Sequence, residues 1–119
     1  MKLKQFEIWM TDLEPHTGSE QGGKRPVVVV ETNAVSPHAP TAVVIPLSSQ
    51  ITKIYSFDVI VDPTSENGLT VRSKMMFRQI RVIDKVRLKK KMGILEEKYR
   101  PDFKARIHLL FDLEEAFKE

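Results

Sequence analysis

The sequence predicts a mainly β fold: a small, mostly antiparallel barrel of short strands with one helix packed on it at the C-terminal end. Two observations support this prediction. Short runs of β-branched and aromatic residues, separated by proline, glycine and asparagine, occupy most of the chain. Apolar residues at helical spacing occupy its last part. A chain of 119 residues can bury a modest core, so we expect a single domain over residues 1–119.

Four segments are predicted strands, at residues 6–13, 26–30, 41–47 and 56–61. The first and the last alternate apolar with polar side chains, and the middle two are β-branched runs typical of buried neighbouring strands. Between the first two strands, the segment from Glu14 to Lys24 contains Pro15 and three glycines. This composition predicts a mobile loop, and such loops often have a functional role.

Residues 71–83 mix apolar with basic side chains. They predict one long strand with an apolar and a charged face, and a helix is the alternative. Asp84, which follows, is suited to cap a short turn over residues 85–88.

The C-terminal segment has the clearest periodicity. Its apolar residues recur at steps of four, three, three and four: Phe103, Ile107, Leu110, Leu113 and Phe117. This spacing predicts an amphipathic helix whose apolar stripe belongs to the core. Pro101 fits the first turn of that helix.

Positive charge is concentrated in one part of the chain. The net charge is +3, but residues 72–106 hold 13 Lys and Arg against 4 acids, a local net charge of +9. This distribution favours a polyanionic partner, because each phosphate neutralised by a cation releases counterions. The alternative is a solvated charged face. No apolar stretch has the length of a signal core or a membrane span, so we expect a soluble cytoplasmic protein.

Several kinds of chemistry have no sequence signature here. The chain has no cysteine, and His16, His38 and His108 are far apart in sequence without metal-ligand spacing. The glycines at 22 and 23 precede two basic residues, but Pro26 and a strand follow, unlike a phosphate-binding loop that opens a helix. We therefore expect neither a metal nor another cofactor.

Three ordered motifs remain distinctive. Residues 18–26 read Gly-Ser-Glu-Gln-Gly-Gly-Lys-Arg-Pro between two strands, residues 46–49 read Pro-Leu-Ser-Ser, and residues 79–88 read Gln-Ile-Arg-Val-Ile-Asp-Lys-Val-Arg-Leu. Together with Glu-Ile-Trp at 7–9 and Asp-Leu-Glu-Pro at 12–15, they resemble the MazF/PemK (Kid) family of toxins from type II toxin–antitoxin systems. The resemblance covers nearly the whole chain.

This resemblance implies a dimer of small SH3-like barrels, the MazF/CcdB-like toxin fold. It also implies an endoribonuclease that cleaves single-stranded mRNA at short motifs and is silenced by a co-expressed antitoxin, which we expect to be acidic and partly disordered. The catalytic pair carried over is Arg25 and Ser48. RNA supplies its own nucleophile, the 2′-hydroxyl, so a metal-independent enzyme needs alignment, proton transfer and charge stabilisation. A 2′,3′-cyclic phosphate is the expected product.

The roles within this pair follow from side-chain chemistry. Arg25 presents a planar fork of donors to phosphate oxygens, which suits it to stabilise transition-state charge rather than to transfer protons. Ser48 can hydrogen-bond the scissile phosphate, and Ser49 is an alternative for this role. One branch of the family has an Arg-x-Asp-Gln stretch that supplies an acid–base pair. Residues 76–79 here read Met-Phe-Arg-Gln instead, so this pair is absent. His16 is a candidate proton carrier, against the plainer interpretation of a solvated loop histidine.

The remaining site predictions concern RNA binding. The residues expected to contact RNA are Ser19, Glu20, Gln21, Lys24, Ser49, Arg78, Gln79 and Arg81. Gln79 and Arg81 could instead stabilise the barrel or a dimer interface. Trp9 could stack on a base, but a core or interface position is the favoured interpretation. The three lysines at 89–91 are more typical of a solvated run than of a specific site, but they can add non-specific attraction to RNA. The alternative function is a non-catalytic module on the same fold, either a gyrase-poison-like protein or an RNA binder that does not cleave.

Overall fold

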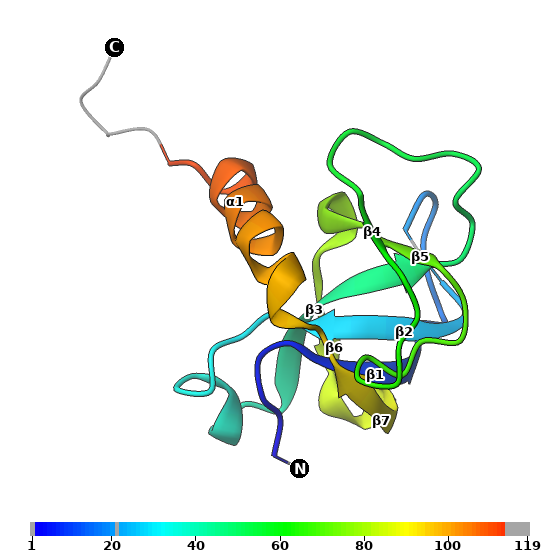
Figure 1. Ribbon diagram of the computed structural model, residues 1–119. Helices are drawn as coiled ribbons and strands as arrows, with labels where there is room; N and C mark the ends of the chain where they lie inside the picture. The colour runs from blue at the N-terminus through cyan, green and yellow to red at the C-terminus, as the bar shows by residue number, and fades with distance from the viewer. Residues whose placement is uncertain (1, 21, 114–119) are drawn as a thin grey trace.

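The computed structural model describes residues 2–20 and 22–113. Its strands are β1 (Glu7–Asp12), β2 (Lys24–Val29), β3 (Thr41–Ser48), β4 (Val59–Val61), β5 (Ser73–Met75), β6 (Arg81–Asp84) and β7 (Leu88–Ile94). Its helices are α1 (Arg100–Leu110) and four short 3₁₀ turns, η1 (Ser36–His38), η2 (Phe77–Gln79), η3 (Lys85–Arg87) and η4 (Glu97–Tyr99). The expected mainly β architecture with one C-terminal helix is confirmed, and α1 lies beside the strongly curved sheet (Figure 1).

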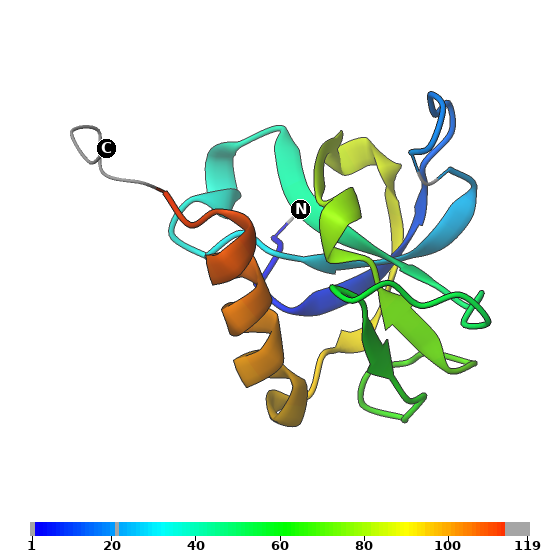
Figure 2. The same cartoon turned by 90° about the horizontal axis from the view of Figure 1, so that it is seen from above.

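The sheet is antiparallel and open. Its order is β4-β5-β3-β2-β1-β7, and β6 pairs with β3 off this path. The expected small barrel is therefore not closed: within the described chain, no hydrogen-bonded ladder joins β4 to β7. Instead, side chains fill the space between the two edges, because Val59 and Val61 of β4 share a core cluster with Leu95, which follows β7. Figure 2 shows the curved sheet from above, with α1 at one side.

The prediction of one long strand at residues 71–83 is wrong. The segment is divided into β5, η2 and β6, which pair with different parts of the same edge of β3. On β3, Val44 and Leu47 are three residues apart, whereas their partners Arg81 and Met75 are six apart. The turn η2 takes up the three extra residues and directs the ring of Phe77 into the core, where it is fully buried.

Two other strands differ from the sequence prediction. The strand expected at 56–61 is shortened to β4, because the preceding residues form a turn in which the N–H of Asp58 donates to the carbonyl of Tyr55 at 2.9 Å. β7 was not predicted, since its run of lysines does not alternate. It pairs with β1 through two irregularities of register. Asp84 makes no capping hydrogen bond, contrary to expectation, and the Lys85 N–H donates instead to the carbonyl of Pro40.

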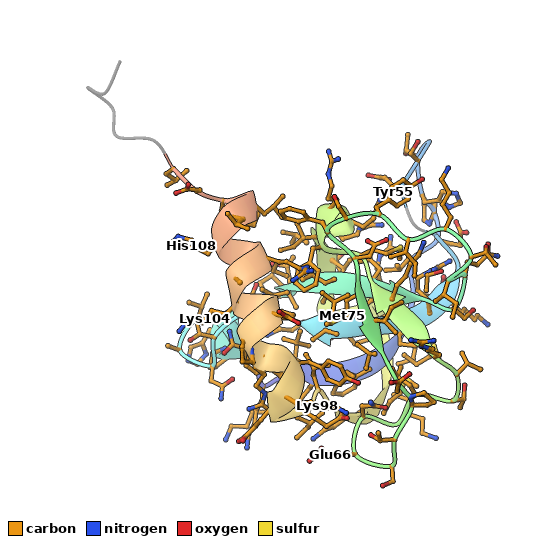
Figure 3. All side chains as sticks on the ribbon, turned by 45° about the horizontal axis from the view of Figure 1, so that its top comes forward. Tyr55, Glu66, Met75, Lys98, Lys104 and His108 are labelled. Atoms are coloured by element: carbon orange, nitrogen blue, oxygen red, sulfur yellow. The ribbon has the colours of Figure 1, made fainter. Side chains whose placement is uncertain are left out.

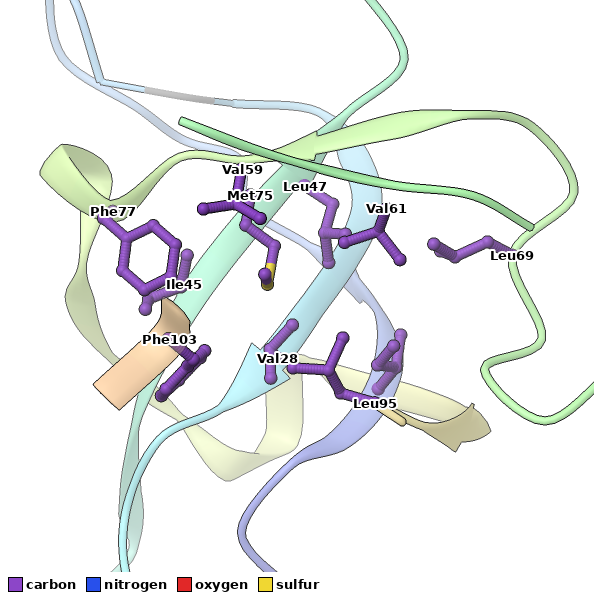
Figure 4. Packing of buried hydrophobic residues seen from close by; sticks show 11 residues of the cluster. Val28, Ile45, Leu47, Val59, Val61, Leu69, Met75, Phe77, Leu95 and Phe103 are labelled. Carbon is purple, nitrogen blue, oxygen red and sulfur yellow. The ribbon is translucent and has the colours of Figure 1, made fainter. Parts of the chain in front are cut away.

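The core has two clusters. The larger one lies inside the curve of the sheet, with α1 at one end (Figure 4), and consists of Ile8, Val28, Ile45, Leu47, Val59, Val61, Leu69, Met75, Phe77, Leu95 and Phe103. Phe103 joins α1 to it, with its ring edge-on to Phe77 at a centroid distance of 5.2 Å. The smaller cluster consists of Leu3, Leu13, Val27, Ala42, Val44, Ile83 and Leu88.

The helix prediction is right for its first turns only. Pro101 lies in the first turn as expected, Phe103 is buried, and Ile107 packs partly against the core. The helix ends at Leu110, so Leu113 is 89% exposed and the core position expected for it is wrong. Phe117 lies outside the described residues. Among the helices that the structure describes, none has the length and apolar character needed to cross a membrane.

Candidate active site

Arg25 and Ser48 come together at the ends of neighbouring strands. β2 and β3 pair with Val27 opposite Pro46, and the same register continued by two residues sets Arg25 opposite Ser48. The guanidinium of Arg25 also reaches β3, since Nη1 donates to the carbonyl of Leu47 at 3.4 Å. Both side chains line a pocket of about 270 Å³, together with Met10, Lys24, Pro26, Leu47, Ser49, Gln50, Leu69, Thr70, Val71, Ser73 and Met92.

The Arg25 side chain is held from several directions. Its Nε donates to the carbonyl of Gly22 at 2.8 Å, and its own carbonyl accepts a 2.8 Å bond from the buried hydroxyl of Thr11. Burial lowers the pKa of Arg25, and the negative charge of Glu14 partly opposes this effect. Guanidinium nevertheless stays protonated in proteins. A fixed, partly desolvated cation of this kind is suited to stabilise the charge of a phosphorane.

Ser48 is the better positioned of the two serines. Its side chain is largely enclosed, with the residue only 7% exposed, and its Oγ accepts a bond from the N–H of Gln50 at 3.1 Å. A hydroxyl that accepts at its oxygen can still donate its proton to a phosphate oxygen. Ser49 also lines the pocket but is exposed.

Hydrogen bonds close the neck of the loop that precedes Arg25. The N–H of Leu13 donates to the carbonyl of Gly23 at 2.9 Å, and within the loop the N–H of Thr17 donates to Oε1 of Glu20 at 2.9 Å. Figures 1 and 2 both show this blue loop on the same side of the molecule as the green loop that follows β3. The two loops therefore lie on the same side of the molecule, and Ser49 and Gln50 of the second loop line the pocket.

His16 lies in this loop and is not among the residues that line the pocket. Its Nδ1 is 2.7 Å from Oε2 of Glu14, and its ring lies over Gly22, where an added Cβ would come within 2.0 Å of Nδ1. Glu20 is exposed in the same loop, and Gln21 lies outside the described residues.

A second pocket, of about 400 Å³, contains other predicted RNA contacts. Its lining residues are Ser19, Tyr55, Ser56, Phe57, Asp58, Lys74, Met76, Arg78 and Gln79. The amide of Gln79 donates to the carbonyl of Ser19 at 3.4 Å and so links η2 to the loop. The eight predicted contacts thus divide: Lys24 and Ser49 lie with Arg25 and Ser48 in the first pocket, and Ser19, Arg78 and Gln79 lie here. Arg81 is half-buried on β6 and belongs to neither described lining.

Trp9 has a structural role. Its Nε1 donates to Oε1 of Glu7 at 3.1 Å, and its ring packs against the smaller core cluster. Trp9 is not among the described residues that line either pocket. This favours the core interpretation over base stacking. Sequence reasoning missed Tyr55 and Lys74, because nothing in their local sequence says which loop and strand enclose the second pocket. The described residues also contain no group of three His, Cys, Asp or Glu side chains placed to hold a metal ion.

Comparison with known proteins places this fold and motif set in one family. Residues 4–111 match the PemK-like, MazF-like toxins of type II toxin–antitoxin systems. This chain belongs to that family. Among its relatives in the family, the Bacillus subtilis (strain 168) endoribonuclease EndoA is 35% identical over 97 residues, 82% of this chain and 84% of the relative. The Staphylococcus saprophyticus endoribonuclease MazF is 33% identical over 96 residues, 81% of this chain and 80% of the relative.

Solved structures of the family have the same fold. MazF from Deinococcus radiodurans (form I) superposes with a TM-score of 0.80 at 20% identity, covering 95% of this chain and 99% of that one. The MazE–MazF structure (form II) from the same organism gives a TM-score of 0.74 at 18% identity, covering 96% of this chain and 99% of the other. At this level of identity the likeness concerns the fold, and it agrees with the expected MazF-like architecture.

Proposed function

We propose that this toxin is a metal-independent, sequence-selective endoribonuclease that cleaves single-stranded RNA, with Arg25 and Ser48 as its catalytic residues. The observation that carries the proposal is the register of β2 and β3, which sets a partly desolvated arginine opposite an enclosed serine beside an open pocket. The names of the relatives support the same activity, since EndoA and MazF are both endoribonucleases.

The chemistry needs little from the protein. The 2′-oxygen of the RNA attacks the adjacent phosphorus, the bond from phosphorus to the 5′-oxygen breaks, and the departing oxygen takes up a proton. The products are a 2′,3′-cyclic phosphate and a 5′-hydroxyl. Arg25 stabilises the charge on the non-bridging oxygens, and Ser48 donates a hydrogen bond that aligns the phosphate. No residue of the pair has to act as a base: water takes the proton of the 2′-hydroxyl, and water supplies the proton that the departing 5′-oxygen takes up.

The RNA strand occupies both pockets in this proposal. Lys24 and Ser49 contact the nucleotide at the cleaved linkage, and Ser19, Arg78 and Gln79 contact a neighbouring nucleotide. Glu20, Gln21 and Arg81 complete the predicted contact set from the loop and from β6. The local excess of basic residues over 72–106 supports a polyanionic ligand.

We propose two protein partners, an acidic antitoxin and a second copy of the chain. Family membership and the MazE–MazF structures of Deinococcus radiodurans support the first. Val82 and Val86, both exposed apolar residues near β6, support an apolar interface with a second copy. The cytoplasm is the proposed location, because it holds the mRNA substrate, and residues 1–119 form one toxin domain.

The test is cleavage of a long single-stranded RNA by purified protein in EDTA, with the new ends mapped. Wild type is compared with Arg25→Ala, Ser48→Ala and Ser49→Ala, and with Lys104→Ala and Ser65→Ala as matched controls on exposed positions away from both pockets. Discrete cuts with cyclic phosphate ends, abolished by Arg25→Ala and retained by both controls, are expected. RNA binding without any cleavage by wild type would reject the enzyme and favour the non-catalytic module.

A further inference from the structure

We infer that Tyr55 is a stacking platform for one nucleobase of the RNA strand, next to the catalytic pair. The inference rests on the proposed function and names a contact that contributes to affinity for the RNA strand. Tyr55 lines the second pocket with Arg78 and Gln79, and it is 57% exposed. Figure 3 shows Tyr55 on the loop between β3 and β4, on the side of the molecule away from the labelled residues of α1.

Core packing does not explain this exposed ring. The neighbouring Phe57 packs against the larger core cluster, whereas Tyr55 is among the exposed large apolar side chains. Partly exposed aromatic rings beside basic side chains are typical of single-strand binding surfaces, because any base can stack on such a ring. In this inference, base stacking, which is one interpretation of Trp9 from the sequence, is the role of Tyr55.

The loop holds Tyr55 in a defined position. The N–H of Tyr55 donates to Oδ2 of Asp58 at 2.8 Å, and the N–H of Asp58 donates back to the carbonyl of Tyr55 at 2.9 Å. Lys74 anchors this turn to β5: its Nζ donates to the carbonyl of Lys53 at 2.5 Å and lies 3.9 Å from Oδ2 of Asp58. The side chains of Lys74 and Asp58 are only 8% and 5% exposed, so this anchoring contact is shielded from solvent.

The ammonium groups of two lysines lie over the ring of Tyr55. Nζ of Lys53 is 5.4 Å and Nζ of Lys74 is 5.7 Å from the ring centroid of Tyr55. Cations at these distances are attracted to the ring. They also make the neighbourhood of the ring favourable for the phosphates on either side of a stacked base.

The same lysine connects Tyr55 to the catalytic pair. Lys74 of β5 pairs directly with Ser48 of β3, and continued register places Arg25 on the other side of Ser48. Directly opposed residues in antiparallel strands have their side chains on one face of the sheet. Arg25, Ser48 and Lys74 therefore form a row across three strands, at whose end the Tyr55 ring stands. In this inference, the RNA strand runs along the row. Its phosphate is bound by Arg25 and Ser48, and a neighbouring base stacks on the tyrosine.

The experiment is a mutant cycle between the ring and the bases. The RNA contains the mapped cleavage motif with a 2′-deoxy nucleotide at the cut, so that it binds without being cleaved. A series of such RNAs, each with one abasic nucleotide, is titrated against wild type, Tyr55→Phe and Tyr55→Leu. Fluorescence polarisation gives Kd, and single-turnover cleavage of the all-ribose RNA gives the rate.

Tyr55→Leu is expected to weaken binding by roughly 10- to 100-fold, and Tyr55→Phe to stay within about twofold of wild type. One abasic RNA is expected to weaken wild type by a similar factor and to have no further effect on Tyr55→Leu. The cleavage rate at saturating protein should change much less than Kd. Phe111→Leu is the matched control, because Phe111 is 55% exposed but lies past the end of α1, and it should bind like wild type.

Equal affinity of wild type and Tyr55→Leu for every RNA would overturn the inference, as would additive effects at every abasic position. Neither result touches the proposed function, which depends on cleavage of the all-ribose RNA by wild type. Lys74→Met adds a second readout. It removes a cation near the bound phosphates and also releases the turn, so it should weaken binding more in the wild-type background than in the Tyr55→Leu background. Equal losses in the two backgrounds would contradict the anchoring role.

Discussion

Arg87 holds the neck of the loop that precedes Arg25, donating from Nη1 to the carbonyl of Glu14 at 2.6 Å. The same nitrogen is 3.3 Å from the carbonyl of Asp12. Arg87 belongs to η3, 73 residues farther along the chain than Glu14. Since Glu14 acts electrostatically on Arg25 and the loop carbonyl of Gly22 binds it, we expect Arg87 to position the Arg25 guanidinium from outside the described pocket lining.

Arg87→Ala is expected to lower the single-turnover cleavage rate by roughly tenfold, because a small displacement of a catalytic group costs about that much or more. The loop amides of residues 14–23 should exchange hydrogen faster, as followed by mass spectrometry. Arg72→Ala is the control: Arg72 forms an exposed ion pair with Asp62, and such pairs contribute little. Unchanged exchange in the loop of Arg87→Ala would contradict the clamp.

Arg25→Lys is expected to reduce the cleavage rate by about 100-fold or more while RNA binding changes far less. An ammonium keeps the positive charge but cannot present a planar fork to two phosphate oxygens. Ser48→Thr should retain most activity, since the hydroxyl remains, and Ser48→Ala should lose at least about tenfold. Wild-type rates in Arg25→Lys would show that charge alone suffices and would remove the fork from the mechanism.

Gly93→Ala is expected to destabilise the fold by about 2 kcal/mol or more. A Cβ at this position would lie 2.2 Å from the carbonyl oxygen of Glu66, where the end of β7 meets a turn. That oxygen also accepts the N–H of Ile94 at 2.9 Å, so backbone has to move. Gly18→Ala is the control, with a φ of +56° but nothing within 4 Å, and should cost only about 1 kcal/mol. Urea unfolding measures both, and equal losses would contradict the steric argument.

Glu7 makes stability depend on pH in the acid range. Burial tends to raise the pKa of this carboxyl, but hydrogen bonds from the Lys4 N–H, Lys91 and Trp9, with the charge of Lys91, lower it overall from its ordinary 4.5. A lowered pKa in the folded state contributes stability above the unfolded value of 4.5, and this is lost as pH falls through the folded value. Glu7→Gln should therefore lose about 1–3 kcal/mol at neutral pH. The difference from wild type should shrink below pH 4.5 in urea unfolding. A pH-independent loss in Glu7→Gln would contradict the assignment.

Local sequence determined much of this toxin. Valine-rich runs and alternating segments place β1, β2 and β3 within a residue or two, because side-chain periodicity decides which residues can face a core. The helical spacing places α1, and the Gly-rich motif before Pro26 marks the segment that supplies Arg25. The family resemblance rests on such short, contiguous motifs and needs no tertiary information.

Tertiary pairing decided the rest. Whether residues 71–83 form one strand or two depends on the edge of β3, where η2 absorbs a register difference that no local pattern encodes. The open sheet and the end of α1 before Leu113 likewise depend on which side chains reach the core. The row from Arg25 through Ser48 to Lys74, with Tyr55 at its end, joins four segments distant in sequence. Periodicity specifies which face a residue occupies, but only the pairing of strands specifies its neighbours across that face.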